Sequence, residues 1–200
     1  MDVNRLVLAS GNEGKVREFQ KIFLELGIQV VRQADLGIPT PDEPFATFLE
    51  NALVKARHAS SFSGLPALAD DSGICVDALG GSPGVRSARF SGSASTDETN
   101  NQLLLERLRG SNNRSCHYYC VIVFVKFAED PTPLVADARW HGEILEGPRG
   151  SGGFGYDPIF YDPLVNKTGA EMSLAQKNVR SHRGKAMQKI ISLLRESYFS

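Results

Sequence analysis

The stretch from Arg5 to Lys15 constrains the fold more than any other part of the sequence. A short apolar run, Leu6 to Ala9, stops at the turn formers Ser10-Gly11-Asn12. Apolar residues at helical spacing follow at once, namely Val16, Phe19, Ile22, Phe23 and Leu26. This order predicts a buried strand, a tight turn and a helix, so we expect an α/β fold in which helices flank a sheet.

The turn after this first strand is a candidate anion site. Its backbone N–H groups and the N-terminus of the following helix would face an incoming anion, and phosphate is the anion we expect. Gly11 and Gly14 let the backbone approach closely, while Ser10 and Asn12 add side-chain hydrogen bonds. Lys15 adds a mobile positive charge. The spacing matches neither the P-loop nor the dinucleotide fingerprint, and an ordinary capped turn with a surface lysine is the alternative interpretation.

Charge and composition narrow the class of protein. The 200 residues carry a formal net charge of −1, so the chain lacks the basic field of a protein that holds long DNA or RNA. No apolar run suits a signal peptide or a membrane span, and we expect a single domain, residues 1–200, in the cytoplasm. Cys75, Cys116 and Cys120 form no Cys-x-x-Cys pair, and we expect Cys116 and Cys120 to be small core residues.

Further along the chain, apolar patterns and turn residues predict the remaining elements. Asp70 and Asp71 end a short apolar strand, and the later segments alternate between helix and strand patterns. We expect a helix from Thr47 to about Phe62, a strand from Leu65 that ends in Asp70-Asp71-Ser72-Gly73, a helix capped by Thr96, a long central hairpin of Cys116–Phe127 and Leu134–Leu145, and a final helix from about Ser181.

The acidic residues Asp70, Asp71 and Glu50 form the candidate metal and base cluster. A hard cation such as Mg²⁺ prefers carboxylate oxygens together with phosphate oxygens of a substrate. Adjacent residues of an extended segment point to opposite faces, so we expect Asp71 to face the reaction. Asp70 is then either a second metal ligand or a residue that contacts the metal ligands without binding the metal itself. A solvated acidic turn is the alternative.

Two further groups carry aromatic and basic side chains. Phe154-Gly155-Tyr156-Asp157 lies in a glycine-dense loop and offers aromatic faces to a base or sugar. Lys177, His182 and Arg183 gather near the start of the last helix, where they could donate to phosphate or to a carbonyl oxygen on a base edge. A plain hairpin loop and a charged helix surface are the respective alternatives.

The motifs occur in a particular order between Leu6 and Leu194. They are Ser-x-Asn-x-x-Lys, Thr-Phe-x-Glu-Asn-Ala, Ala-Asp-Asp-Ser-Gly, Gly-Gly-Ser-Pro-Gly, Gly-Gly-Phe-Gly-Tyr-Asp-Pro, and Lys177 followed by Ser-His-Arg. Together they resemble the inosine/xanthosine triphosphate pyrophosphatase family. Two departures are small: Ser10 stands where Thr is common, and Gln176 replaces a frequent acid.

The resemblance implies hydrolysis of the non-canonical purine nucleoside triphosphates ITP, dITP and XTP to the monophosphate and pyrophosphate. Such an activity needs Mg²⁺ and removes these nucleotides before they enter DNA or RNA. We expect a cytosolic homodimer whose fold is a long twisted mixed sheet with flanking helices and two lobes with a cleft between them. A pyrophosphatase for other modified nucleotides, or a nucleotide sensor without turnover, are the alternative functions.

The resemblance also implies roles for particular residues. Glu50 and Asp71 would hold the metal, and Asp71 would in addition be the catalytic proton acceptor. The substrate would be bound by Ser10, Gly11, Asn12, Glu13, Gly14, Lys15, Ser72, Phe154, Gly155, Tyr156, Asp157, Lys177, His182 and Arg183.

Overall fold

The computed structural model describes residues 4–11, 16, 19–20, 23–24 and 27–198, and the chain divides into two compact units. Unit 1 comprises Met1–Asp71, Val121–Asp137 and Ala186–Ser200, and unit 2 comprises Ser72–Cys120 and Ala138–Lys185. The expectation of one bilobed domain stays a prediction.

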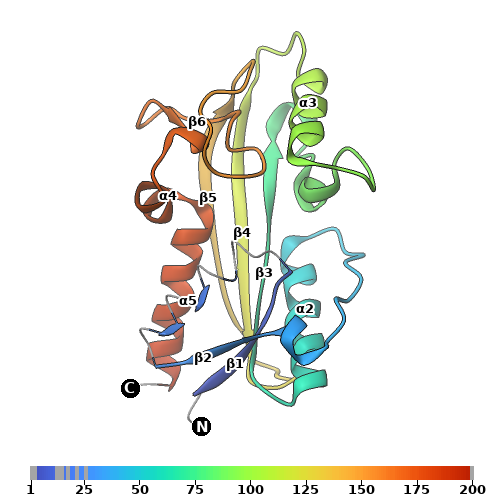
Figure 1. Ribbon diagram of the computed structural model, residues 1–200, viewed down its shortest axis with the longest axis vertical. Coiled ribbons are helices and arrows are strands. Elements are labelled where there is room, and N and C mark those ends of the chain that lie inside the picture. The colour runs from blue at the N-terminus through green and yellow to red at the C-terminus, as the bar shows by residue number, and fades with distance from the viewer. Residues whose placement is uncertain (1–3, 12–15, 17–18, 21–22, 25–26, 199–200) are drawn as a thin grey trace. The chain divides into compact units, whose positions relative to one another are not determined.

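The strands of the described residues form one seven-stranded sheet in the order β2-β1-β3-β4-β5-β6-β7. Strand β1 is parallel to both β2 and β3, whereas β6 is antiparallel to β5 and to β7. The sheet is therefore mixed, as predicted, and β4 and β5 lie inside it (Figure 1). The strand bounds are β1 Arg5–Ala9, β2 Gln29–Arg32, β3 Ala67–Val76, β4 Ser115–Val125, β5 Leu134–Ile144, β6 Phe160–Asp162 and β7 Lys167–Thr168.

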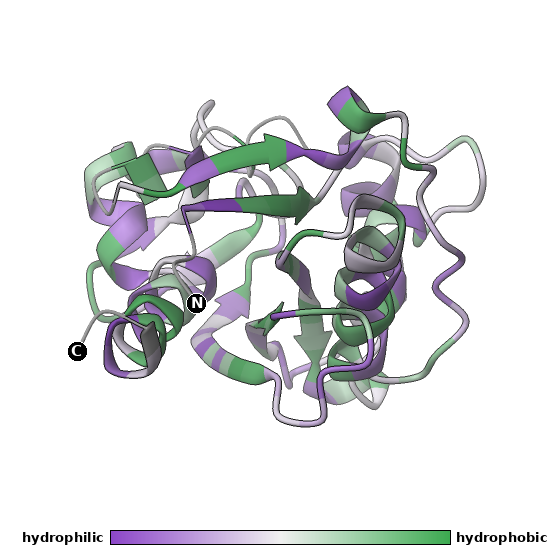
Figure 2. Cartoon of the chain, turned by 90° about the horizontal axis from the view of Figure 1, so that it is seen from below, coloured by the Kyte–Doolittle hydropathy of each residue, from purple (hydrophilic) through white to green (hydrophobic). Residues whose placement is uncertain are grey.

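Helices flank the strands, which confirms the α/β class. They are α2 Phe48–Ser63, α3 Asp97–Arg107, α4 Leu174–Arg180 and α5 His182–Tyr198, with 3₁₀ helices at Gln33–Leu36, Asp77–Leu79, Gly84–Arg89 and Gly169–Glu171. The helix that leads to the C mark in Figure 2 carries both hydrophobic and hydrophilic segments, as a half-buried helix does. Among the described residues, no helix is both long and apolar enough to pass through a membrane.

The core of unit 1 forms where β1 and α2 pack together. Strand β1 buries Leu6 and Leu8 completely, and α2 turns the small side chains of Ala52, Ala56 and Ala59 inward. Small residues on this face let the helix backbone lie close to the sheet. The predicted helix ends are confirmed. The Thr47 hydroxyl accepts from Glu50 N–H, and Gly64 ends the helix at a φ of 68°.

The core of unit 2 is aromatic. Tyr118, Trp140 and Phe160 meet with ring centroids 4.5–6.1 Å apart, and Leu104 and Leu108 of the α3 segment join the same cluster. The three cysteines are free thiols, and Cys116 and Cys120 are buried as expected. This cluster supports residues of the candidate site described below.

The predicted end of β3 is wrong. The strand does not end within Asp70-Asp71-Ser72-Gly73 but continues to Val76. Gly73 leaves no room for a Cβ beside Gly84 and Ser87, and the Ser87 hydroxyl accepts from Ile74 N–H at 2.9 Å. A packed 3₁₀ helix thus holds two turn-forming residues in an extended conformation. Helix α4 and the short strands β6 and β7 were not predicted either.

Candidate functional site

In unit 1, the register of the parallel strands aligns the end of β1 with the part of β3 just before the acidic pair. Ala9 at the end of β1 pairs with Ala69 of β3, the residue before Asp70. Ser10 follows β1 and is half-buried, and Gly11 is exposed. Asn12, Glu13, Gly14 and Lys15 lie outside the described residues, so their part in the phosphate turn stays a prediction.

The central cation of unit 1 is Lys55, which the sequence analysis missed. Its ammonium group donates to Asp71 Oδ1 at 3.2 Å and lies 3.3 Å from Glu43 Oε1. Burial alone would lower the pKa of Lys55, but the charges of Asp71, Asp70 and Glu43, with the hydrogen bond to Asp71, raise it above its ordinary value. Lys55 is therefore a fixed positive charge at neutral pH.

Glu43, rather than Glu50, shares a partner with Asp71. Glu50 lies exposed in the first turn of α2, where its carboxylate accepts from the Thr47 hydroxyl at 2.6 Å. The loop before α2, which carries Glu43, is fixed by the buried side chain of Asn51. The Asn51 side-chain oxygen accepts from Phe45 N–H, and its side-chain nitrogen donates to Phe45 O, both at 3.2 Å.

The donor set of unit 1 suits a hard cation. Asp70 and Asp71 are 2% and 8% exposed, and with Glu43 they place carboxylates around Lys55. Within the described ranges, no group of three His, Cys, Asp or Glu side chains could hold a metal by itself. One or two carboxylates are enough to hold a hard divalent cation when water and substrate phosphate oxygens supply its other ligands.

In unit 2, the loop 153–157 is shaped around the buried carboxylate of Asp157. Its Oδ2 accepts from Phe154 N–H at 2.8 Å and pairs with the Lys177 ammonium group. Gly153 has a φ of 75°, and a Cβ there would collide with the Asp157 carboxylate. The Tyr156 hydroxyl donates to Ser87 O at 2.8 Å. The loop is therefore held in one conformation by side-chain hydrogen bonds and is not a plain hairpin connection.

Helix α3 holds the same loop from its other side. Asp97 accepts from Gly155 N–H at 2.6 Å, and Asn101 donates to the oxygen of Gly155 at 2.9 Å. Side chains of α3 therefore bind both the backbone N–H and the backbone oxygen of Gly155. The neighbouring Phe154 is 45% exposed.

The basic residues converge on Phe154. The Lys177 ammonium group lies 4.5 Å from the centre of the Phe154 ring, and the Arg183 guanidinium lies 5.7 Å from it. Arg183 also donates to the Ser72 hydroxyl at 3.2 Å. Cations within about 6 Å of an aromatic face are attracted to it, so both basic groups are held beside the ring. The structure thus brings Ser72, Phe154, Asp157, Lys177 and Arg183 together within unit 2.

His182 and Arg183 are 5% and 6% exposed, so the interpretation of a charged helix surface is wrong for them. The buried Ser181 hydroxyl accepts from Gly184 N–H at 3.1 Å, which fixes the first turn of α5. The preceding helix α4 carries Lys177 and begins with a capping box in which Ser173 pairs with Gln176. That pairing gives the departure at Gln176 a structural role.

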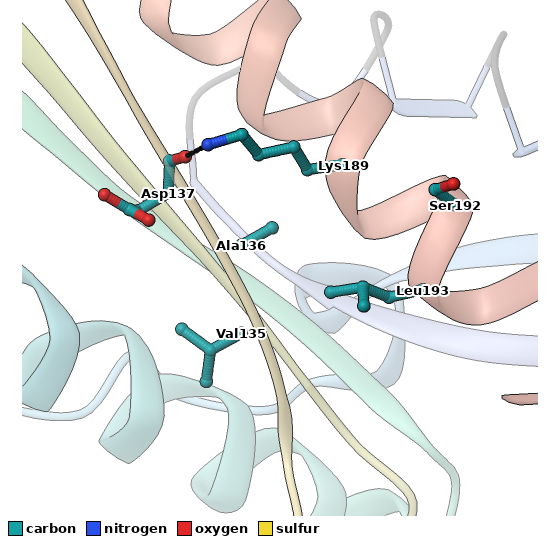
Figure 3. Close-up of a pocket in the computed structure, with 6 residues that line it drawn as sticks. All are labelled: Val135, Ala136, Asp137, Lys189, Ser192 and Leu193. Atoms are coloured by element: carbon teal, nitrogen blue, oxygen red, sulfur yellow. Dashed lines mark hydrogen bonds between the residues drawn. The ribbon is translucent and has the colours of Figure 1, made fainter. Parts of the chain in front are cut away.

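A separate cavity of about 280 Å³ in unit 1 is not this site. Figure 3 shows that its one ammonium group, from Lys189, donates to the backbone oxygen of Asp137 at 2.6 Å. None of the residues predicted from the sequence lines it. The others that do are Val135, Ala136, Ser192 and Leu193.

Comparison with known proteins places this architecture in a family. The model of the Ham1 family matches residues 6–193, which is nearly the whole chain. The chain belongs to the Ham1 family. Among the solved structures of the family, a HAM1 protein from Coxiella burnetii superposes with a TM-score of 0.93 at 44% identity, covering 96% of this chain and 99% of that one.

Curated relatives of this Ham1 chain carry an activity in their names. A dITP/XTP pyrophosphatase of Nitrosomonas europaea is 52% identical over 195 residues, covering 98% of this chain and 96% of the relative. A dITP/XTP pyrophosphatase of Chromobacterium violaceum is 55% identical over 192 residues, covering 96% and 98% respectively. The family expected from the sequence motifs is confirmed.

Proposed function

We propose that this Ham1 chain hydrolyses non-canonical purine nucleoside triphosphates, ITP, dITP and XTP, to the monophosphate and pyrophosphate. The observation that carries the proposal is identity above one half, over nearly the whole of both chains, with relatives named dITP/XTP pyrophosphatases. Removing such nucleotides would keep them out of DNA and RNA.

Unit 1 supplies the groups for the phosphate chemistry. Asp71 would accept the proton of a water that attacks the α-phosphorus, while the bond from that phosphorus to the bridging oxygen of pyrophosphate breaks. Lys55 fixes the Asp71 carboxylate and adds positive charge. Ser10 and the turn through Lys15 would bind the triphosphate.

A divalent metal, which we propose to be Mg²⁺, would neutralise charge on the phosphate oxygens when it is bound. Asp71 is the proposed carboxylate ligand, with Asp70 beside it or behind it. For the second ligand the shared contact with Lys55 favours Glu43 over Glu50, since Glu50 is exposed and already bonded to Thr47.

Unit 2 supplies the groups for recognition of the base. The Phe154 ring would stack on the purine, and Lys177 would reach a phosphate or a base edge. His182 and Arg183 would donate to the 6-oxo group of hypoxanthine or xanthine. Adenine carries a 6-amino group at that place, which would leave these buried donors without an acceptor, so ATP would be a poor substrate.

The family resemblance supports a homodimer in the cytoplasm. Light scattering on the purified chain measures its mass in solution, and a mass of one 21.8 kDa chain would contradict the dimer.

The decisive experiment compares turnover of ITP, dITP and XTP with that of the four standard ribonucleotides, with and without Mg²⁺. The proposal expects the monophosphate and pyrophosphate in equal amounts from the first three, and only with the metal. Release of orthophosphate would contradict the reaction proposed. Preference for modified pyrimidines would indicate the other pyrophosphatase function, and binding without hydrolysis would indicate a sensor.

A further inference from the structure

Tyr118 lies directly against a residue of the proposed base site. Its ring stacks on the imidazole of His182 with centroids 4.6 Å apart and an interplanar angle of 4°. Both side chains are buried, at 7% and 5% exposure. The near-parallel faces leave the ring nitrogens of His182 at the edge of the stack, and an imidazole N–H donates in the plane of its ring.

Tyr118 is itself held on two sides. The Trp140 ring lies 6.1 Å away at an angle of 22°, and the Phe160 ring 4.7 Å away at 53°. Trp140 is anchored in turn, because its indole N–H donates to Asp162 Oδ2 at 2.8 Å. The plane of Tyr118 is therefore set by the core of unit 2 and does not depend on a bound nucleotide.

The phenol of Tyr118 remains neutral under working conditions. Burial, and after it the nearby charge of Asp157, raises the pKa of Tyr118 well above its ordinary value of 10.0. The imidazole of His182 thus faces an uncharged ring at neutral pH. A neutral aromatic face stacks on an imidazole without adding a competing charge to the base site.

We propose that Tyr118 is a positioning residue for base selection, because it fixes the plane in which His182 donates to the 6-oxo group. The inference rests on the proposed function and adds a residue that no motif of the sequence indicated. A donor held in one plane discriminates between a 6-oxo and a 6-amino group, since it cannot rotate to avoid the wrong one.

The experiment compares Tyr118→Leu, Tyr118→Phe and the wild type. For each protein, kcat/KM is measured with ITP and with ATP, and thermal unfolding confirms that the protein is folded. Tyr118→Leu removes the stacked ring, and we expect its preference for ITP over ATP to fall about tenfold. Tyr118→Phe keeps the ring, and its preference should stay within about twofold of the wild type.

A matched control separates positioning from loss of packing. Phe124 lies on the same strand, is fully buried and belongs to unit 1, so Phe124→Leu removes a core ring but keeps the Tyr118 ring that stacks on His182. This variant should lose stability and keep the preference. If Tyr118→Leu does not fold, Tyr118→Met replaces it, because a flexible thioether fills irregular core space.

The outcomes distinguish this inference from the proposed function. A wild type that fails to hydrolyse ITP overturns both. A wild type that prefers ITP, together with a folded Tyr118→Leu or Tyr118→Met variant of unchanged preference, overturns only the role of Tyr118. An equal fall in preference in Phe124→Leu overturns it as well, since general loss of packing would then explain the effect.

Discussion

Replacing Lys55 with methionine tests the acidic group of unit 1 most directly. Methionine keeps most of the volume of the lysine stem but removes the charge that faces Asp71 and Glu43. The side chains of Lys55 and Asp71 are each 11% exposed, so water cannot replace the lost partner effectively. Removing one partner of a buried ion pair lowers the free energy of unfolding by about 3–5 kcal/mol. Because this pair is slightly exposed, we expect a loss of about 3 kcal/mol for Lys55→Met.

The pH dependence of this loss follows from the raised pKa of Lys55. A group whose pKa is higher in the folded state contributes its full stability below the ordinary value, here 10.5, and loses it as the pH rises through the folded value. The difference between wild type and Lys55→Met should therefore be constant from about pH 7 to pH 9 and shrink only in more alkaline solution.

Urea unfolding of four proteins measures the effect: the wild type, Lys55→Met, Asp71→Asn and the double variant. Because Lys55 and Asp71 are in contact, the double variant should lose about 2 kcal/mol less than the sum of the single losses. Additive losses, or a Lys55→Met protein within about 0.5 kcal/mol of the wild type, would refute the interpretation of Lys55 as the central cation.

Three further predictions concern the proposed reaction. Asp71→Asn should lower ITP turnover at least about 100-fold with the dissociation constant for ITP nearly unchanged in calorimetry; near-normal turnover would exclude Asp71 as proton acceptor. Arg183→Ala should reduce the ITP-over-ATP ratio of kcat/KM by about tenfold or more, and an unchanged ratio would exclude Arg183 from base selection. Gly153→Ala should lower the free energy of unfolding in urea by about 1–3 kcal/mol and raise KM, because its φ of 75° and the adjacent Asp157 leave no place for a Cβ. Gly147→Ala is the control. A Cβ there would meet open space, so neither quantity should change.

Local signals predicted the helices and strands that depend on neighbouring residues. Thr47 and Gly64 bracket α2 as expected, and Thr96 caps α3. Each of these signals acts within one helical turn, through a side-chain hydrogen bond or a left-handed glycine. The apolar run of β4 and the alternating pattern of β5 likewise identified two inner strands of the sheet.

Structural features that depend on contacts between residues distant in the sequence could not be predicted in this way. Ser72 and Gly73 are turn formers by local preference, but the Gly84–Arg89 helix packs against Gly73, bonds to Ile74 N–H and keeps β3 extended. Lys55 belongs to none of the motifs singled out in the sequence, and only the fold shows that it faces Asp71 and Glu43. Knowledge of the α2 face that packs on the sheet could have singled it out as a charge on a buried stripe.

The sequence by itself determined the family, the α/β class and the residue types available for phosphate and base chemistry, because short motifs and periodic patterns record these directly. Only the tertiary structure decided which side chains share a partner: Glu43 in place of Glu50 beside Lys55, and Tyr118 against His182. Such pairs join residues far apart in the chain, and their partners are set by strand register and helix packing, which no local pattern contains.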